Sequence, residues 1–110
     1  MVKLITLLKR KPGTTREEFS KYWLHPHGDI ILKTLPGVRK YVQNPAVIIG
    51  DREYEYDGVA EGWFDDIDSL RNALRVMRSE KGDVIREDEE KFLDRSKMVS
   101  FVVDEREVRL

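Results

Sequence analysis

Apolar and polar residues alternate in short blocks along the chain, and the first blocks predict a strand followed by a helix. Residues 2–8 are mostly apolar and lead into a charged segment that ends in Pro12-Gly13, which is typical of a strand ending in a turn. Thr14 and Glu17 have the spacing of a capping box, so a helix is expected to begin there. Its aromatic residues recur at helical spacing and predict one apolar face: Phe19, Tyr22 and Trp23.

A proline interrupts this helical pattern. Pro26 disfavours helical backbone at His25, so the helix is expected to end or kink at that residue. A second, shorter helical stretch is predicted from Asp29 to Leu35, where Pro36-Gly37 stops it.

Three further blocks predict strands. They cover residues 38–49, 59–64 and 98–103, and Pro45 makes the second half of the first of them an edge or a bulge. A charged tail, residues 104–110, follows the last strand.

Two more helices are expected between the last two strands. Asp65-Asp66 caps the first of them, and its apolar side is formed by Ile67, Leu70, Ala73, Leu74 and Met77. After Gly82 comes an acidic helical stretch with sparse apolar anchors at Val84, Ile85, Phe92 and Leu93.

The resulting order of elements is β-α-β-β-α-β, the ferredoxin-like plait of the α+β class. It predicts a four-stranded antiparallel sheet with the helices on one face. A chain of 110 residues has room for one hydrophobic core, so residues 1–110 are expected to form a single domain.

The first and last strands are apolar on both faces. Residues 4–8 and 99–103 lack the alternation of a sheet with one solvated face. Since the helices cover only one face, we expect the other face to pack against the same sheet of a second copy, giving a homodimer.

The composition and charge of the chain argue against a disordered or nucleic-acid-binding protein. The chain is 40% hydrophobic and 37% charged, which fits a folded domain with solvated helices. Lys and Arg outnumber Asp and Glu by nine to three in residues 1–50, whereas the acidic residues lead by eighteen to eleven in residues 51–110. The two halves nearly cancel, and the chain lacks the basic surplus of a nucleic-acid-binding protein.

The chain contains no cysteine. Disulfides, thiolate metal sites and cysteine nucleophiles are therefore excluded, and a reducing cytoplasm is the expected location. The apolar run of residues 2–8 is too short for a signal peptide or a membrane span, so no membrane association is expected.

Both histidines lie at the predicted helix break, in the segment Trp23-Leu24-His25-Pro26-His27-Gly28. A histidine that titrates near neutral pH is the usual general acid or base. Two positions apart on an irregular segment, the two rings are expected to point different ways, and no third histidine completes a zinc site. The alternative is that they only cap the helix end or lie on the surface.

The predicted strand at residues 59–64 carries small residues on one face. Gly58, Ala60 and Gly62 alternate with Val59, Glu61 and Trp63, so the two sets face opposite ways. Such a face leaves room either for a ligand or for a closely packed helix.

Two polar residues of the predicted sheet are candidates for chemistry. Glu61 is expected to be covered on both faces, where its pKa would be raised and it would serve as a partner for an arginine such as Arg39 or as a catalytic acid or base. Tyr41 lies on the second strand, where its phenol either orients a ligand oxygen or anchors the core.

Segments along nearly the whole chain resemble the EthD-like family of the dimeric α+β barrel superfamily. They are Lys3–Gly13, Glu17–Trp23, His27-Gly28, Leu35–Asn44 and Tyr56–Phe64. The resemblance singles out His27, because the family's histidine stands four residues after the tryptophan. The family usually has a proline two residues after this histidine, whereas here Asp29 follows Gly28 and the proline stands at position 26.

The resemblance implies a homodimer whose sheets form a barrel around small-molecule sites. Relatives catalyse cofactor-free lactone isomerisation, polyketide cyclisation, dehydration or decarboxylation, and steps linked to ether degradation, so this chain is expected to act on a small lactone, aromatic or polyketide-like metabolite. It suggests His27 as general base or acid, Tyr41 as the group that holds the substrate oxygen and Glu61 as their orienting partner. Trp23 and Trp63 would form apolar walls beside Gly58 and Ala60, with neither cofactor nor metal.

Two alternatives remain open at this stage. More distant barrel relatives bind haem or act as monooxygenases, and His27 would then be an axial ligand. The second alternative is that the protein binds a small metabolite of a degradation pathway without catalysing a reaction.

Overall fold

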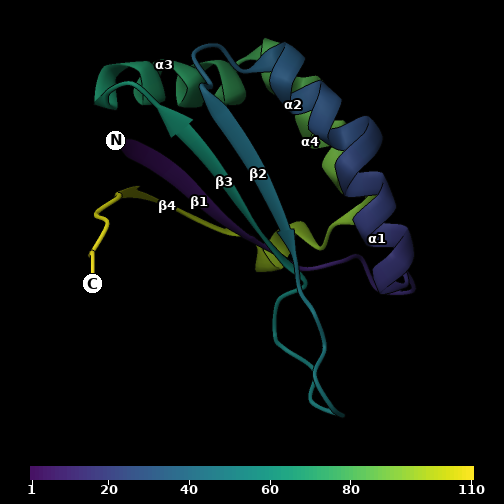
Figure 1. Ribbon diagram of the computed structural model, residues 1–110. Helices are drawn as coiled ribbons and strands as arrows, with labels where there is room; N and C mark the ends of the chain where they lie inside the picture. Colours follow the sequence, from purple (N-terminus) through teal and green to yellow (C-terminus); the bar gives the residue numbers. More distant parts are fainter.

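Four antiparallel strands form one sheet in the order β2-β3-β1-β4 in the computed structural model, which describes residues 1–110 (Figure 1). The strands are β1 (Val2–Leu8), β2 (Lys40–Pro45), β3 (Gly58–Phe64) and β4 (Val99–Asp104). Thr6 of β1 faces Ala60 of β3 on one side and Ser100 of β4 on the other. These three residues therefore lie in one row across the same face of the sheet.

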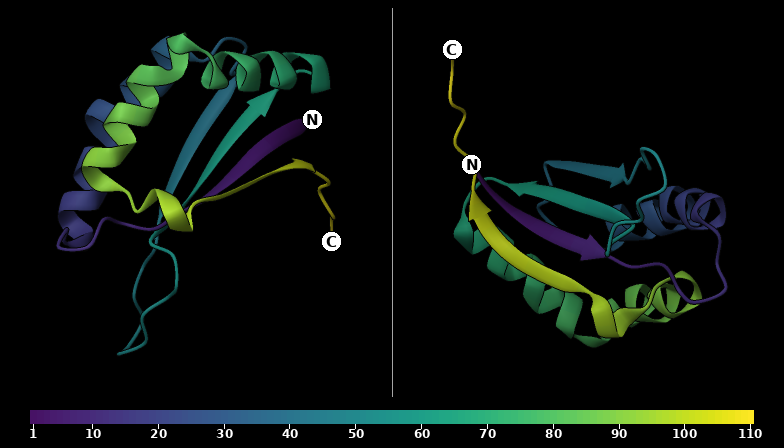
Figure 2. Two further views of the ribbon diagram at one scale, coloured as in Figure 1. Left: turned by 180° about the vertical axis from the view of Figure 1, so that it is seen from behind. Right: turned by 90° about the horizontal axis from the view of Figure 1, so that it is seen from below.

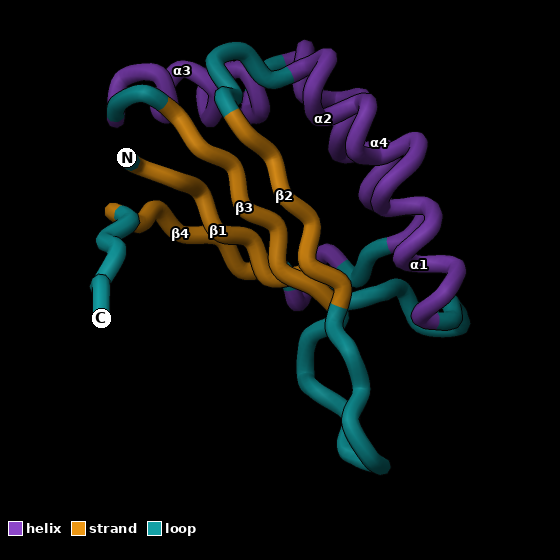
Figure 3. The backbone as a smooth tube through the Cα atoms, viewed as in Figure 1, coloured by secondary structure: helices purple, strands orange, loops and turns teal.

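All of the helices pack on one face of this sheet, as Figures 2 and 3 show. They are α1 (Arg16–Tyr22), α2 (Gly28–Thr34), α3 (Ile67–Arg78) and α4 (Asp83–Phe92), with short helical turns at Trp23–His27, Glu80–Gly82 and Arg95–Lys97. The predicted antiparallel plait with helices on one face is confirmed.

Helix α1 begins one residue later than the sequence analysis predicts. Thr15, not Thr14, is the N-cap, and it forms a reciprocal capping box with Glu18. Thr14 instead belongs to the preceding turn, where its N–H donates to the Lys11 carbonyl at 3.0 Å. Both threonines have a glutamate three residues later, and the turn decides between them.

The chain kinks between α1 and α2, as predicted from Pro26. His25 has extended backbone angles (φ −139°, ψ 128°) within the wide turn Trp23–His27. The kink sends the two histidines in opposite directions. The His27 side chain is buried, whereas that of His25 is 68% exposed.

The core fills the space between the helices and one face of the sheet. Its largest cluster surrounds Phe19, Trp23 and Phe92, whose rings lie 5.3–5.8 Å apart along the cluster. Smaller clusters form where α3 meets the sheet, around Leu70, and where α2 meets α4, around Ile85. This face of the sheet is called the inner face below.

No helix covers the opposite face of the sheet, which is called the outer face below. Apolar side chains there include Ile5, Leu7, Val42, Val59, Val99, Phe101 and Val103. Phe101 is 51% exposed. None of the helices has the length and apolar character that crossing a membrane requires.

Candidate functional site

A partly enclosed cavity, called the enclosed cavity below because it is more closed than the second cleft, has a volume of about 210 Å³ and lies between the inner face of the sheet and the helices. Most of its wall is apolar and comes from all four strands and from α2 and α3. The polar side chains that line it are Thr6, His27, Tyr41, Arg78, Glu89 and Ser100.

His27 reaches this cavity as part of a buried hydrogen-bonded chain of three side chains. Its Nδ1 lies 2.8 Å from Oδ2 of Asp88, and the Tyr22 hydroxyl donates to Oδ1 of the same carboxylate at 2.6 Å. His27 and Asp88 are 3% and 4% exposed. Lys91 places its ammonium 3.9 Å from the carboxylate, so Asp88 contacts two hydrogen-bonding side chains and one cation.

This arrangement determines which ring nitrogen of His27 is free. Both Asp88 oxygens act as acceptors, so we assign the imidazole proton to Nδ1. Nε2 then keeps its lone pair and has no partner within the protein. A neutral imidazole held by a carboxylate on one side, with a free nitrogen on the other, is the arrangement of a general base.

Two opposing influences act on the protonation of His27. Burial lowers the pKa of His27 below its ordinary value, and the hydrogen bond and charge of Asp88 partly offset this. The imidazole ring also lies 4.8 Å from the ring of Phe92. The ring is therefore neutral and ready to accept a proton at neutral pH.

Tyr41 of β2 supplies a hydroxyl on the same cavity. Burial raises the pKa of Tyr41, so the phenol stays protonated and can donate a hydrogen bond. Beside it, the Gln43 amide donates to the Trp23 carbonyl at 2.7 Å. The structure thus places Tyr41 and His27, two of the three predicted catalytic residues, on one cavity.

The small-residue face of β3 is used in both of the ways that the sequence left open. Ala60 and Gly62 line the cavity, as does Trp23. Gly58 lies beneath the Trp23 ring, and a Cβ atom there would come within 2.6 Å of Trp23 Cζ3. Gly58 therefore makes room for the tryptophan that forms the wall, but does not itself line the cavity.

Two predicted site residues lie on the outer face instead. Glu61 accepts hydrogen bonds from Lys3 Nζ at 2.7 Å and Asn44 Nδ2 at 3.0 Å, and these bonds lower its pKa, contrary to the expected increase. Trp63 is packed between the ammonium groups of Lys3 and Lys40. The expectation that Glu61 orients His27 or Tyr41, and that Trp63 forms a cavity wall, is therefore wrong for this chain.

The expected pairing of Glu61 with Arg39 is also wrong. Arg39 donates two hydrogen bonds to Oδ2 of Asp65, at 3.0 and 2.7 Å. Strand alternation puts the side chain of Glu61 on the other face of the sheet from Ala60 and Gly62, and the helices cover the face of Ala60, so Glu61 points away from them.

Asp88 and Glu89 are site residues that the sequence analysis missed. Both belong to the acidic stretch that forms α4, yet their side chains are buried. Ile85, Asp88, Glu89 and Phe92 have the i, i+3, i+4, i+7 spacing of one helix face, and this spacing was the signal that could have found them. Burial raises the pKa of Glu89, while Arg95 Nε lies 3.4 Å from its carboxylate.

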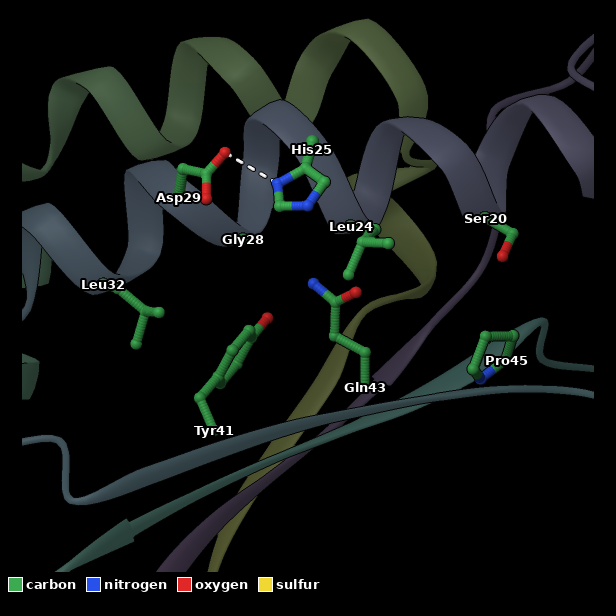
Figure 4. A pocket seen from close by; sticks show the side chains of 9 residues that line it. All are labelled: Ser20, Leu24, His25, Gly28, Asp29, Leu32, Tyr41, Gln43 and Pro45. Atoms are coloured by element: carbon green, nitrogen blue, oxygen red, sulfur yellow. Dashed lines mark hydrogen bonds and ion pairs between the residues drawn. The ribbon is translucent and has the colours of Figure 1, made fainter.

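A second, open cleft of about 310 Å³ lies along the edge strand β2, beneath α2 (Figure 4). His25 is on its rim, with Nδ1 2.8 Å from Asp29 Oδ2. Tyr41 lines both this cleft and the enclosed cavity, so it separates the two. No group of three or more His, Asp or Glu side chains is placed to hold a metal ion.

Residues 11–96 match the EthD domain family. Among solved structures, an ethyl tert-butyl ether D (EthD) family protein from Bacillus halodurans C-125 is 25% identical, with a TM-score of 0.71 over 96% of this chain and 99% of its own. No curated protein matches the chain.

Two more distant structures share the fold. A dimeric ferredoxin-like protein of unknown function from Thermobifida fusca YX is 13% identical, with a TM-score of 0.64 over 93% of this chain and 88% of its own. SnoaB, a cofactor-independent oxygenase from Streptomyces nogalater, is 11% identical, with a TM-score of 0.62 over 97% and 94% of the two chains.

Proposed function

The chain belongs to the EthD domain family, and from this premise we propose that it is a cofactor-independent enzyme acting on a small organic molecule. The reaction class is isomerisation, cyclisation or elimination initiated by removal of a proton. The substrate is a compact lactone, aromatic or polyketide-like compound held in the enclosed cavity.

The observation that carries this proposal is the buried pair of His27 and Asp88 beside an apolar cavity. Nε2 of His27 takes a proton from an acidic C–H or O–H group, and the Asp88 carboxylate stabilises the imidazolium that forms. The protonated Tyr41 hydroxyl donates to the oxygen on which negative charge develops. The apolar wall excludes water and strengthens both interactions.

The likeness to SnoaB supports the absence of a cofactor in this proposal, since that protein is a cofactor-independent oxygenase on the same fold. A haem-linked role has less support. A cavity of about 210 Å³ lies below the range of about 300–1,000 Å³ common for ligand sites and does not fit a porphyrin.

We also propose that the functional unit is a homodimer formed by the outer faces of two sheets. The apolar residues of that face have no cover within the chain, and Phe101 and Val99 are 51% and 41% exposed. The similar protein from Thermobifida fusca is dimeric, which supports this assembly.

The two histidines provide a matched test of the proposed chemistry. The protein is screened for turnover of small lactones and phenolic or polyketide-like compounds, and the hit is assayed with His27→Asn and His25→Asn. His27→Asn is expected to lower turnover by about 10²–10⁴-fold, because the general base is lost. His25→Asn changes a surface side chain and is expected to retain turnover.

Thermal melting of both variants separates loss of chemistry from loss of fold. A folded His27→Asn protein with full turnover would contradict the proposal. If the wild-type protein and His27→Asn bind a compound equally well and neither converts it, the protein is a non-catalytic binder.

A further inference from the structure

The enclosed cavity has a recognisable mouth. Of the 18 residues that line it, only Arg78 and Ser100 are exposed, and the others are buried or half-buried. His27 is among the buried ones, so it lies deep in the cavity. The mouth therefore lies between the end of α3 and the edge strand β4, the edge seen from behind in Figure 2.

Arg78 is directed to this mouth by the helix that carries it. Leu70, Leu74 and Arg78 follow one another at intervals of four residues on α3. Leu70 is in the core and Leu74 lines the cavity, so the same stripe ends in a guanidinium group at the opening.

The Arg78 guanidinium has no partner within the protein. Elsewhere on α3, Arg71 faces Asp68 at 3.9 Å and Arg75 donates to Asn72 at 3.3 Å. Arg78 forms neither an ion pair nor a hydrogen bond, so its five N–H donors are free.

Two hydroxyl groups, from β1 and β4, line the same cavity. The Thr6 and Ser100 oxygens lie 3.0 Å apart, and both residues line the cavity. One of them donates to the other, which leaves the second free to donate to a ligand.

No acidic group cancels the charge of Arg78 within the cavity. Glu89 is the one carboxyl residue on the lining, and its counter-ion is Arg95. Burial also raises the pKa of Glu89, which favours its neutral form. The chain as a whole, with a net charge of −1, gives no general attraction for anions, so an anion at this mouth would be bound by local groups.

We propose that the mouth formed by Arg78, Ser100 and Thr6 binds the carboxylate of a ligand whose compact apolar body fills the cavity. Arg78 pairs with the carboxylate and a hydroxyl donates to it. This inference rests on the proposed function only in taking the cavity as the substrate site, and it narrows the substrate class to small apolar or aromatic monocarboxylates. The reactive C–H or O–H group then lies at the far end of the molecule, next to His27.

Benzoate and benzamide provide a matched pair of probes, since they share a ring and differ in charge. Each is titrated into the full-length protein at low ionic strength and followed by ¹H–¹⁵N NMR. The wild-type protein is expected to bind benzoate about tenfold more tightly than benzamide, because a charged pair replaces a neutral hydrogen bond. Arg78→Gln is expected to remove this preference.

Arg75→Gln is the control, since it removes an equal charge from the same helical turn outside the cavity lining. It is expected to keep the preference for benzoate, and His27→Asn is expected to keep it as well. Equal binding of the two probes, binding of neither, or equal loss of preference in both arginine variants would overturn the proposal. If turnover depends on His27 but the protein does not prefer benzoate, only this inference is contradicted. If the protein prefers benzoate but His27→Asn keeps full turnover, only the proposed chemistry is contradicted.

Discussion

Asp88 acts on His27 in two ways, by holding its ring orientation and by favouring its charged form. The first effect follows from the 2.8 Å hydrogen bond to Nδ1, which fixes the ring on the cavity lining and leaves Nε2 without a partner. The second opposes the burial that lowers the pKa of His27. Both effects can be measured on the free protein without a substrate.

Asp88→Asn is expected to lower the pKa of His27 further, because the charge that favoured the imidazolium is gone while burial remains. The ring protons of His27, followed by NMR across the pH range, report this change. Asp29→Asn removes the carboxylate beside His25 and is expected to leave the His27 titration unchanged. An unchanged or raised His27 pKa in Asp88→Asn would contradict the assigned pairing.

The burial of the Glu89 side chain makes the stability of the fold depend on pH. Its pKa is higher in the folded state than its ordinary value of 4.5, so the folded state holds this proton more tightly than the unfolded chain. Its contribution to stability is therefore full below the unfolded pKa and is lost as the pH rises through the folded pKa.

Glu89→Gln is expected to raise the free energy of unfolding at pH 7, with no gain at pH 4, because the neutral amide avoids the cost of burying the charged carboxylate. Urea denaturation at the two pH values measures the difference. Glu90→Gln changes a neighbouring side chain that is 70% exposed and near the same arginine, and is expected to have little effect at either pH. Destabilisation of Glu89→Gln at pH 7 but not at pH 4 would show that its pairing with Arg95 outweighs its burial.

At the residue scale, sequence patterns identified some site residues and misplaced others. His27, Tyr41, Trp23 and Ala60 were predicted and line one cavity. Asp88 was missed because charge in an acidic helix indicates a solvated face, and only the packing of α4 against the kinked segment buries it. Strand alternation separated Glu61 from Ala60 correctly, but could not tell which face the helices cover.

At the scale of elements, the Trp23 ring packs directly against the backbone of β3 at Gly58. The glycine at position 58 makes this possible, since any Cβ would meet the indole ring. The strands and helices were predicted because turn residues and apolar periodicity mark their ends. The N-cap was predicted one residue too early because Thr14 and Thr15 both have a glutamate three residues later. The preceding turn includes Thr14, so Thr15 caps the helix.

Gly58→Ala is expected to lower the free energy of unfolding by about 1–3 kcal/mol, the usual cost of overpacking a core. Gly62→Ala is the matched control on the same strand and face. A Cβ there meets only Phe64 Cε2 at 3.7 Å, so this variant is expected to be as stable as the wild type or slightly more stable. Equal stability of the two variants, measured in urea, would contradict the proposed close packing of Trp23.

At the scale of the whole molecule, the sheet separates two surfaces with different roles. The inner face encloses the cavity, while the outer face presents an apolar surface with the Lys3–Glu61 ion pair near its centre. The sequence predicted that the first and last strands are apolar on both faces. The volume of the cavity, in contrast, depends on how the kinked helices and α3 meet above the sheet. No local pattern encodes that geometry.

Phe101→Glu is expected to convert the proposed homodimer to a monomer, because it places a charge in the apolar outer face. Light scattering coupled to size-exclusion chromatography measures the mass. Ile67→Glu replaces an apolar residue of similar exposure, 49%, on α3 and is expected to leave the dimer intact. A monomeric wild-type protein would contradict the proposed assembly.

The central claim is that His27 presents an unprotonated Nε2 to an apolar cavity. The imidazole ¹⁵N chemical shifts of His27, recorded as a function of pH, test it most directly. We expect a proton on Nδ1, a free Nε2 at neutral pH, and a titration of His27 below the ordinary histidine pKa of 6.5. A proton on Nε2 at neutral pH, or a titration at or above 6.5, would contradict it.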